Sequence, residues 1–216
     1  MRAIRCGVVG LVATAVLTAG ACSRERTPPP PPATSASPES APPTERVVGP
    51  LSVDEAQALA TMNDRLREYV NLHVKIEQSL PSLPKEATPQ QIDKNHRMLE
   101  KQMREARATA KPGDLFTEQA RPVIKRLLAT VFGGPDGKQL KASIMDENPV
   151  DPVALKLTVN DRYPDTVPLT SIPPQVLQTL PKLSEDLEYR FIGDWLILFD
   201  VHAHLIADYI DNALPK

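Results

Sequence analysis

The chain has 216 residues, with 25 Lys or Arg and 27 Asp or Glu, and its formal net charge is −2. Nucleic acid binding requires clustered Lys and Arg, so this mildly acidic chain argues against a nucleic acid partner. Both cysteines, Cys6 and Cys22, lie near the N-terminus. The rest of the chain therefore contains no disulfide and no cysteine-ligated metal, and it has to be held together by packing.

The first 21 residues have the layout of a secretory signal. Arg2 and Arg5 precede an uncharged apolar run over residues 6–18, and small residues follow up to Cys22. A small-residue segment ending on cysteine resembles the bacterial lipobox, where the signal is removed and the new N-terminal cysteine is diacylated. Ala19 is a departure, because the residue three before the lipobox cysteine is usually Leu. The apolar run is shorter than the ~20 residues that span a bilayer. We predict a signal peptide over residues 1–21 and lipidation of Cys22; an ordinary cleaved signal is the alternative.

Residues 23–50 contain nine prolines and few apolar side chains. Such a stretch buries too little surface to offset its ordering entropy, so together with Cys22 it is predicted to be a disordered tether. Residues 51–216 are then predicted to form one mainly helical α+β domain.

Two amphipathic helices are predicted to open this domain. Ser52 and Glu55 form a capping box, and an apolar seam then recurs at spacings of 3 and 4 as far as Leu80. Prolines end that helix. Thr88 and Gln91 form a second start signal, followed by a similar seam up to Ala110. A short connection between two such helices predicts an antiparallel helical hairpin.

Further helices are predicted over residues 117–132, around residues 137–145 and from Pro173 to Leu180. Between them, alternation over residues 153–159 predicts a half-buried strand.

Near the C-terminus, LEYRFI and WLILFD flank Gly193-Asp194, which predicts a β-hairpin with a two-residue turn. That register sets Tyr189 opposite Leu198. Residues 201–214 are predicted to be a final helix, with a third strand as the alternative. The expected fold class is α+β, with the helical hairpin and further helices packed on a small three-stranded antiparallel sheet.

The candidate ligand residues are His73 and His96, which lie in the seams of the two hairpin helices. Their positions are symmetric about the predicted loop, so the imidazoles are predicted to face each other in one layer. Two facing imidazoles can ligate haem iron or a divalent metal ion. The chain has no CxxCH and no Glu-x-x-His motif, and a simply packed pair of histidines is the alternative.

Other apparent motifs are not interpreted as functional sites. His202 and His204 resemble the His-x-His metal pair that opens amidohydrolase barrels. A helix would direct the two side chains to different sides, and too little chain follows to supply the remaining strands of such a barrel. The segment Gly133 to Lys138 has a spacing one residue shorter than that of a phosphate-binding loop, and it is predicted to end the preceding helix. No Gly-x-Ser-x-Gly elbow occurs, so no catalytic residue is nominated, and a hydrolase is a third hypothesis only.

Three segments carry a family resemblance: PGDLF at residues 112–116, MDENP at residues 145–149, and LEYRFIGDWLILFD with the following LIAD. From about Leu51 onward the chain resembles an uncharacterised group of small bacterial secreted proteins and lipoproteins. The resemblance implies a shared fold and no known activity.

We therefore expect a lipid-anchored cell-envelope module that binds a ligand or an envelope protein partner, without a cofactor. Ser23 after the lipidated cysteine resembles the outer-membrane default, which favours the outer over the inner membrane. A haem- or metal-binding hairpin using His73 and His96 is the alternative.

Overall fold

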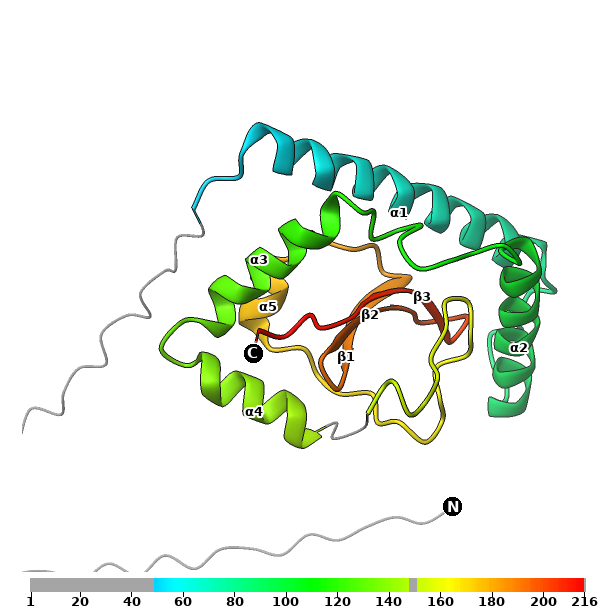
Figure 1. The fold of residues 1–216 in the computed structure, drawn as a ribbon. Coiled ribbons are helices and arrows are strands. Elements are labelled where there is room, and N and C mark those ends of the chain that lie inside the picture. Colours follow the sequence, from blue (N-terminus) through cyan, green and yellow to red (C-terminus); the bar gives the residue numbers. More distant parts are fainter. Residues whose placement is uncertain (1–48, 148–150, 216) are drawn as a thin grey trace, which may run out of the picture. The chain divides into compact units, whose positions relative to one another are not determined.

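The computed structural model describes residues 49–147 and 151–215, within a compact unit that begins at Arg46. The predicted signal peptide, Cys22 and nearly all of the tether lie outside these residues. The elements in chain order are α1 (Val53–Ser79), α2 (Pro89–Ala106), α3 (Ala120–Phe132), α4 (Gly137–Glu147), α5 (Pro174–Thr179), β1 (Leu187–Ile192), β2 (Trp195–Asp200) and β3 (Leu205–Ile210) (Figure 1). This arrangement confirms the α+β fold class. Within the described ranges, none of the helices has the length and apolar character needed to span a bilayer.

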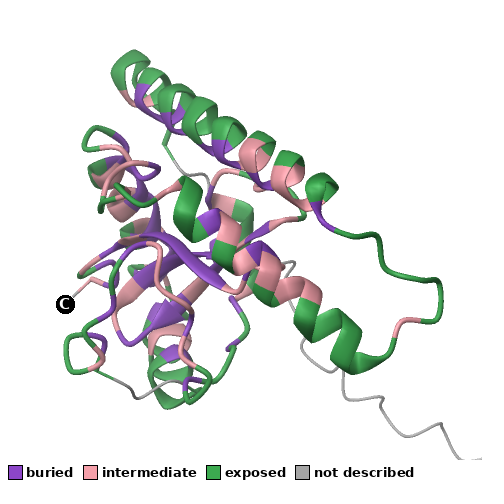
Figure 2. Ribbon diagram, turned by 90° about the vertical axis from the view of Figure 1, so that its right-hand side faces the viewer, coloured by how far each residue is buried: buried purple, intermediate pink, exposed green. Residues whose placement is uncertain are grey.

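The capping signals position the first two helices. The Ser52 hydroxyl accepts the Glu55 amide at 3.2 Å, and the Glu55 carboxylate accepts the Ser52 amide at 2.9 Å. Thr88 and Gln91 make the same reciprocal pair at the start of α2. Because each pair satisfies amides that a helix terminus leaves unbonded, both helices begin where the sequence predicts. The predicted hairpin is present, and Figures 1 and 2 show its helices crossing obliquely.

The sheet is antiparallel, with strand order β1-β2-β3. Tyr189 pairs with Leu198, as the two-residue turn predicts, and Gly193 has φ of +55°, which glycine tolerates without strain. The predicted helix over residues 201–214 is wrong, and the strand alternative is correct. His204 turns the chain back with φ of +57°, and β3 then pairs with β2 from Asp200 to Leu196. A helix would have left the apolar strand β2 with an unpaired edge, which is an unfavourable arrangement.

The strand predicted over residues 153–159 is also wrong. The segment forms turns, and left-handed backbone at Lys156 (φ +50°) and Asn160 (φ +70°) interrupts any extended run. Leu157 and Val159 are nevertheless buried, each 7 % exposed, whereas Val153 is 68 % exposed. The alternating pattern therefore arises from a loop that is partly buried on the sheet. A backbone hydrogen bond from Asn160 N to Ile206 O in β3, at 2.8 Å, joins this loop to the sheet.

Both faces of the sheet are covered. The helices and one sheet face enclose the larger core, and Figure 2 shows buried residues concentrated in the strands. On the other face, the loop that follows α4 packs against the strands in a second cluster, made of Leu157, Tyr163, Val167, Ile192, Ile197, Phe199 and Ile206. This covering explains why the sequence of the β-hairpin is apolar on both faces.

A buried carboxylate joins two of the segments that carry the family resemblance. Asp208 in β3 is 0 % exposed and accepts backbone amides from Gly113, Leu115 and Phe116 at 2.8–3.2 Å. Burial raises the pKa of Asp208, although these amide bonds act in the opposite direction. The PGDLF loop is therefore wrapped around a charged side chain of the sheet, and its role there is structural.

Candidate functional site

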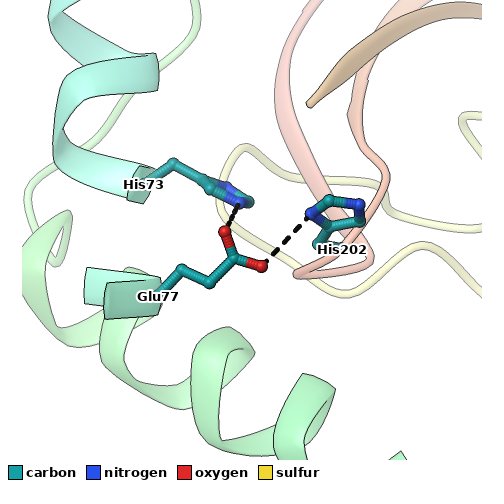
Figure 3. Close-up of side chains that lie close together, drawn as sticks. All are labelled: His73, Glu77 and His202. Carbon is teal, nitrogen blue, oxygen red and sulfur yellow. Dashed lines mark ion pairs between the residues drawn. The ribbon is translucent and has the colours of Figure 1, made fainter. Parts of the chain in front are cut away.

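Polar side chains gather where the C-terminal half of α1 meets the end of β2 and the turn that follows it. His73 and Glu77 lie one helical turn apart on α1, and His202 lies in the turn between β2 and β3 (Figure 3). Asp186, just before β1, has a carboxylate oxygen 3.9 Å from a ring nitrogen of each histidine. We refer to His73, Glu77, Asp186 and His202 as the histidine–carboxylate cluster.

Asp200, the last residue of β2, holds the His73 ring of this cluster in place through a hydrogen bond. Its carboxylate accepts the Tyr69 hydroxyl at 2.6 Å, the Ala203 amide at 2.8 Å and the His73 Nδ1 proton at 2.7 Å. Both Asp200 and His73 are 0 % exposed, so no solvent competes for these bonds. Because Nδ1 carries the proton donated to Asp200, the neutral His73 ring has its free lone pair on Nε2.

That Nε2 atom is the unusual feature of the site. It is buried and has no hydrogen-bond partner, and the same holds for Nδ1 of His202. Nε2 of His73 lies 4.0 Å from a Glu77 oxygen and 3.9 Å from an Asp186 oxygen. Nδ1 of His202 lies 3.5 Å from the other Glu77 oxygen and 3.9 Å from Asp186. Figure 3 shows the Glu77 carboxylate facing both imidazoles.

These distances are close to those of a metal centre. One ligand atom each from His73, Glu77 and His202 lies within 4.8 Å of the others. In a tetrahedral site with bonds of about 2 Å, ligand atoms lie roughly 3.3 Å apart. Small side-chain movements therefore bring these donors to coordination distance of one ion. It is the one such group of three or more ligands among the described residues.

The pKa of His73 is set by two opposing effects, burial and the surrounding carboxylates. Burial, the largest single influence, lowers the pKa of His73. The hydrogen bond to Asp200 and the negative charges of Asp200, Asp186 and Glu77 together outweigh burial, so the pKa lies above its ordinary value. Burial of facing imidazoles in an apolar layer would by itself lower the pKa. The reversal arises because three carboxylates surround the ring, and this negative environment also favours a bound cation.

The predicted direct pairing of His73 with His96 is not found in the described residues. Each ring instead contacts His202, with centroid distances of 5.7 Å for His73 and 6.2 Å for His96. The oblique crossing of α1 and α2 and the inserted β2–β3 turn explain this separation. His96 is half-buried and lies behind His202, outside the set of close ligand atoms.

His202 and His204 do not act as a pair. His204 packs edge-on against Phe199 at 5.1 Å and Tyr163 at 6.3 Å, whereas His202 contacts His73. The expectation that the two side chains diverge is correct, although a turn causes it and not a helix. His202 joins the histidine–carboxylate cluster.

Sequence reasoning missed most of this site. Tyr69, His73 and Glu77 follow one another at intervals of four residues on α1, which is a local signal that they share a helix face. Asp186, Asp200 and His202 have no such signal, because only the folded sheet brings them to α1.

The remaining apparent motif is structural. At residues 133–138 the chain leaves α3 and enters α4, and a Cβ added at Gly137 would lie 1.8 Å from the Phe132 carbonyl oxygen. Glycine is therefore required by the close backbone approach and not by a phosphate.

No protein-family model matches this chain, and comparison with the curated proteins and with the solved structures returned no similar protein. The resemblance to small bacterial lipoproteins therefore stays a prediction.

Proposed function

We propose that this protein is a lipid-anchored module of the bacterial cell envelope whose domain binds a divalent transition-metal ion in the histidine–carboxylate cluster. The observation that carries the proposal is Nε2 of His73. A buried nitrogen without a partner is costly, and here the same ring is held by Asp200 with its lone pair toward Glu77 and His202. A bound cation would satisfy that atom.

The donor set favours a particular class of metal. Two imidazoles with carboxylate oxygens suit Zn²⁺ and neighbouring transition metals, whereas Ca²⁺ and Mg²⁺ prefer sites made wholly of oxygens. Asp200 bonded to the far nitrogen of His73 is the usual outer-shell partner of a metal-bound histidine. Asp186 is close enough to supply a fourth ligand. We therefore infer Zn²⁺ or a metal of similar preference.

The site is open to solvent on one side. The side chains of Glu77 and His202 are 42 % and 41 % exposed, whereas His73 is fully enclosed. An ion can therefore enter and leave without unfolding of the domain. This accessibility favours binding of an exchangeable ion over a sealed structural site. Since Glu77 contacts both imidazoles, a haem plane between the rings would have to displace its carboxylate, and we favour an ion over haem.

Zinc titration of the purified, EDTA-stripped protein tests the metal site. We expect one Zn²⁺ per chain, little competition from Ca²⁺, and at least a tenfold loss of affinity in His202→Ala. His204→Ala is the matched control, because it removes the other imidazole of the same turn and leaves the cluster intact. Absence of stoichiometric binding, or equal losses in both variants, would contradict the proposal. A visible absorption spectrum of the same sample tests for haem.

The anchor is tested separately, because it depends on Cys22 alone. A multiply acylated cysteine holds a protein on a membrane firmly, whereas a single chain does so only marginally. Cys22→Ser should therefore abolish labelling by radioactive fatty acid and release the protein from the membrane fraction. Equal labelling of both proteins would contradict lipidation at this residue. The tether would then place the metal-binding domain at a distance from the membrane surface.

A further inference from the structure

A second candidate site is an apolar pocket beside β1. The pocket has a volume of about 340 Å³ and lies among Ile172, α5, the segment that follows α5, and the first four residues of β1. Its apolar walls include Ile172, Leu177, Leu183 and Leu187. A volume of this order is typical of small-molecule sites, which are mostly apolar with a few polar groups.

The apolar wall continues to the surface. Leu177 on α5 is 51 % exposed, whereas Ile172 and Leu187 at the inner end are 8 % and 3 % exposed. The pocket is therefore hydrophobic from its mouth inward. An alkyl chain inserted there would remove the exposed face of Leu177 from water, which is favourable.

The polar rim has a positive bias. It consists of Lys182, Glu188 and Arg190, and Glu188 is already paired with Arg190. Lys182 is exposed and takes part in no ion pair with another described residue. Arg190 donates to Thr170 O and to Glu188, but its Nε is buried without a partner. The free ammonium group of Lys182 thus borders the apolar pocket, whereas the guanidinium of Arg190 is already engaged or enclosed.

We propose that this pocket binds an aliphatic carboxylate. The alkyl chain would occupy the cavity against Leu177 and Leu183, and the carboxylate would accept a charge-assisted hydrogen bond at the rim from Lys182. An amphiphile with a cationic head group is disfavoured, because it would place positive charge beside Lys182. This binding needs no metal ion, so it stands or falls independently of the histidine–carboxylate cluster.

The test is a titration with decanoate, below its critical micelle concentration, followed by methyl NMR and calorimetry. We expect saturable shifts confined to the Leu and Ile methyl groups of the pocket, and much weaker binding of decyltrimethylammonium. Leu177→Asp should weaken decanoate binding at least tenfold. Leu169→Asp is the matched control, because Leu169 is 49 % exposed and lies outside the pocket.

The charge is tested by Lys182→Glu, which should weaken decanoate binding several-fold, with Lys85→Glu on the exposed α1–α2 loop as its control. Urea unfolding midpoints near that of the parent protein show that the variants are folded. Three results would overturn the proposal: no saturable binding of decanoate, equal losses in the Leu177 and Leu169 variants, or equal affinity for the cationic and anionic probes.

Discussion

Replacing Tyr69 by Phe removes a single hydroxyl from the network that supports the histidine–carboxylate cluster. Tyr69 is 3 % exposed, and its hydroxyl donates to Asp200 at 2.6 Å. The guanidinium of Arg107 lies 4.7 Å from the centre of the ring, a contact that Phe retains. The change in free energy of unfolding should therefore report the hydroxyl and little else.

Hydrogen bonds to charged groups contribute about 1.5–3 kcal/mol. Because the bond is short and fully enclosed, we expect Tyr69→Phe to lower the free energy of unfolding by about 2 kcal/mol. For a domain of this size, that loss corresponds to a fall of roughly 4–8 °C in Tm. Urea and thermal unfolding in the presence of EDTA provide the measurement without a contribution from bound metal.

Tyr189→Phe is the matched control. Tyr189 is 4 % exposed, but its hydroxyl donates at 3.0 Å to a neutral acceptor, the carbonyl of Pro181. A neutral bond contributes about 0.5–1.5 kcal/mol, so this variant should lose about half as much stability. If Tyr69→Phe costs no more than Tyr189→Phe, the bond to Asp200 contributes no more stability than a neutral hydrogen bond.

Three further outcomes are expected. In the metal-free protein, the folded structure raises the pKa of His73 above the unfolded value near ~6.5. Protonated His73 should therefore stabilise the fold below pH ~6.5, and this stabilisation should disappear as the pH rises through the folded pKa. His73→Gln should flatten this dependence in urea unfolding at pH 5.5 and 8, and an unchanged pH profile would contradict the assignment. Asp208→Asn should cost about 3 kcal/mol, because an amide cannot accept all the backbone N–H groups that the carboxylate accepts, whereas Asp64→Asn on the surface should cost less than about 0.5 kcal/mol. Removing residues 23–45, which precede the compact unit, should change the free energy of unfolding by less than about 0.5 kcal/mol, and a larger fall would show that they pack on the domain.

The proposed metal site connects parts of the chain that lie far apart in sequence. Its ligands come from α1, from the loop before β1 and from the β2–β3 turn. A bound ion would hold these parts together and stabilise the folded state by mass action. Zinc should therefore raise the Tm of the parent protein and of His204→Ala, but not of His202→Ala.

Local signals in the sequence determined the helix starts and the β-hairpin. The capping boxes at Ser52 and Thr88 and the turn at Gly193 are each formed by residues a few positions apart. Such interactions depend on the neighbouring backbone alone, so they can be identified before the fold is known.

Tertiary structure decided the rest. Residues 205–210 have a pattern compatible with a helix or a strand, and the open edge of β2 selects the strand. In the alternating segment 153–159, Leu157 packs against a sheet face although the backbone is not extended, and Val153 stays exposed. His73 was recognisable as a seam residue, but its partners Asp200, Asp186 and His202 lie more than 100 positions away. The direction of its pKa shift follows from those distant charges, because electrostatic interactions depend on separation in space and not along the chain.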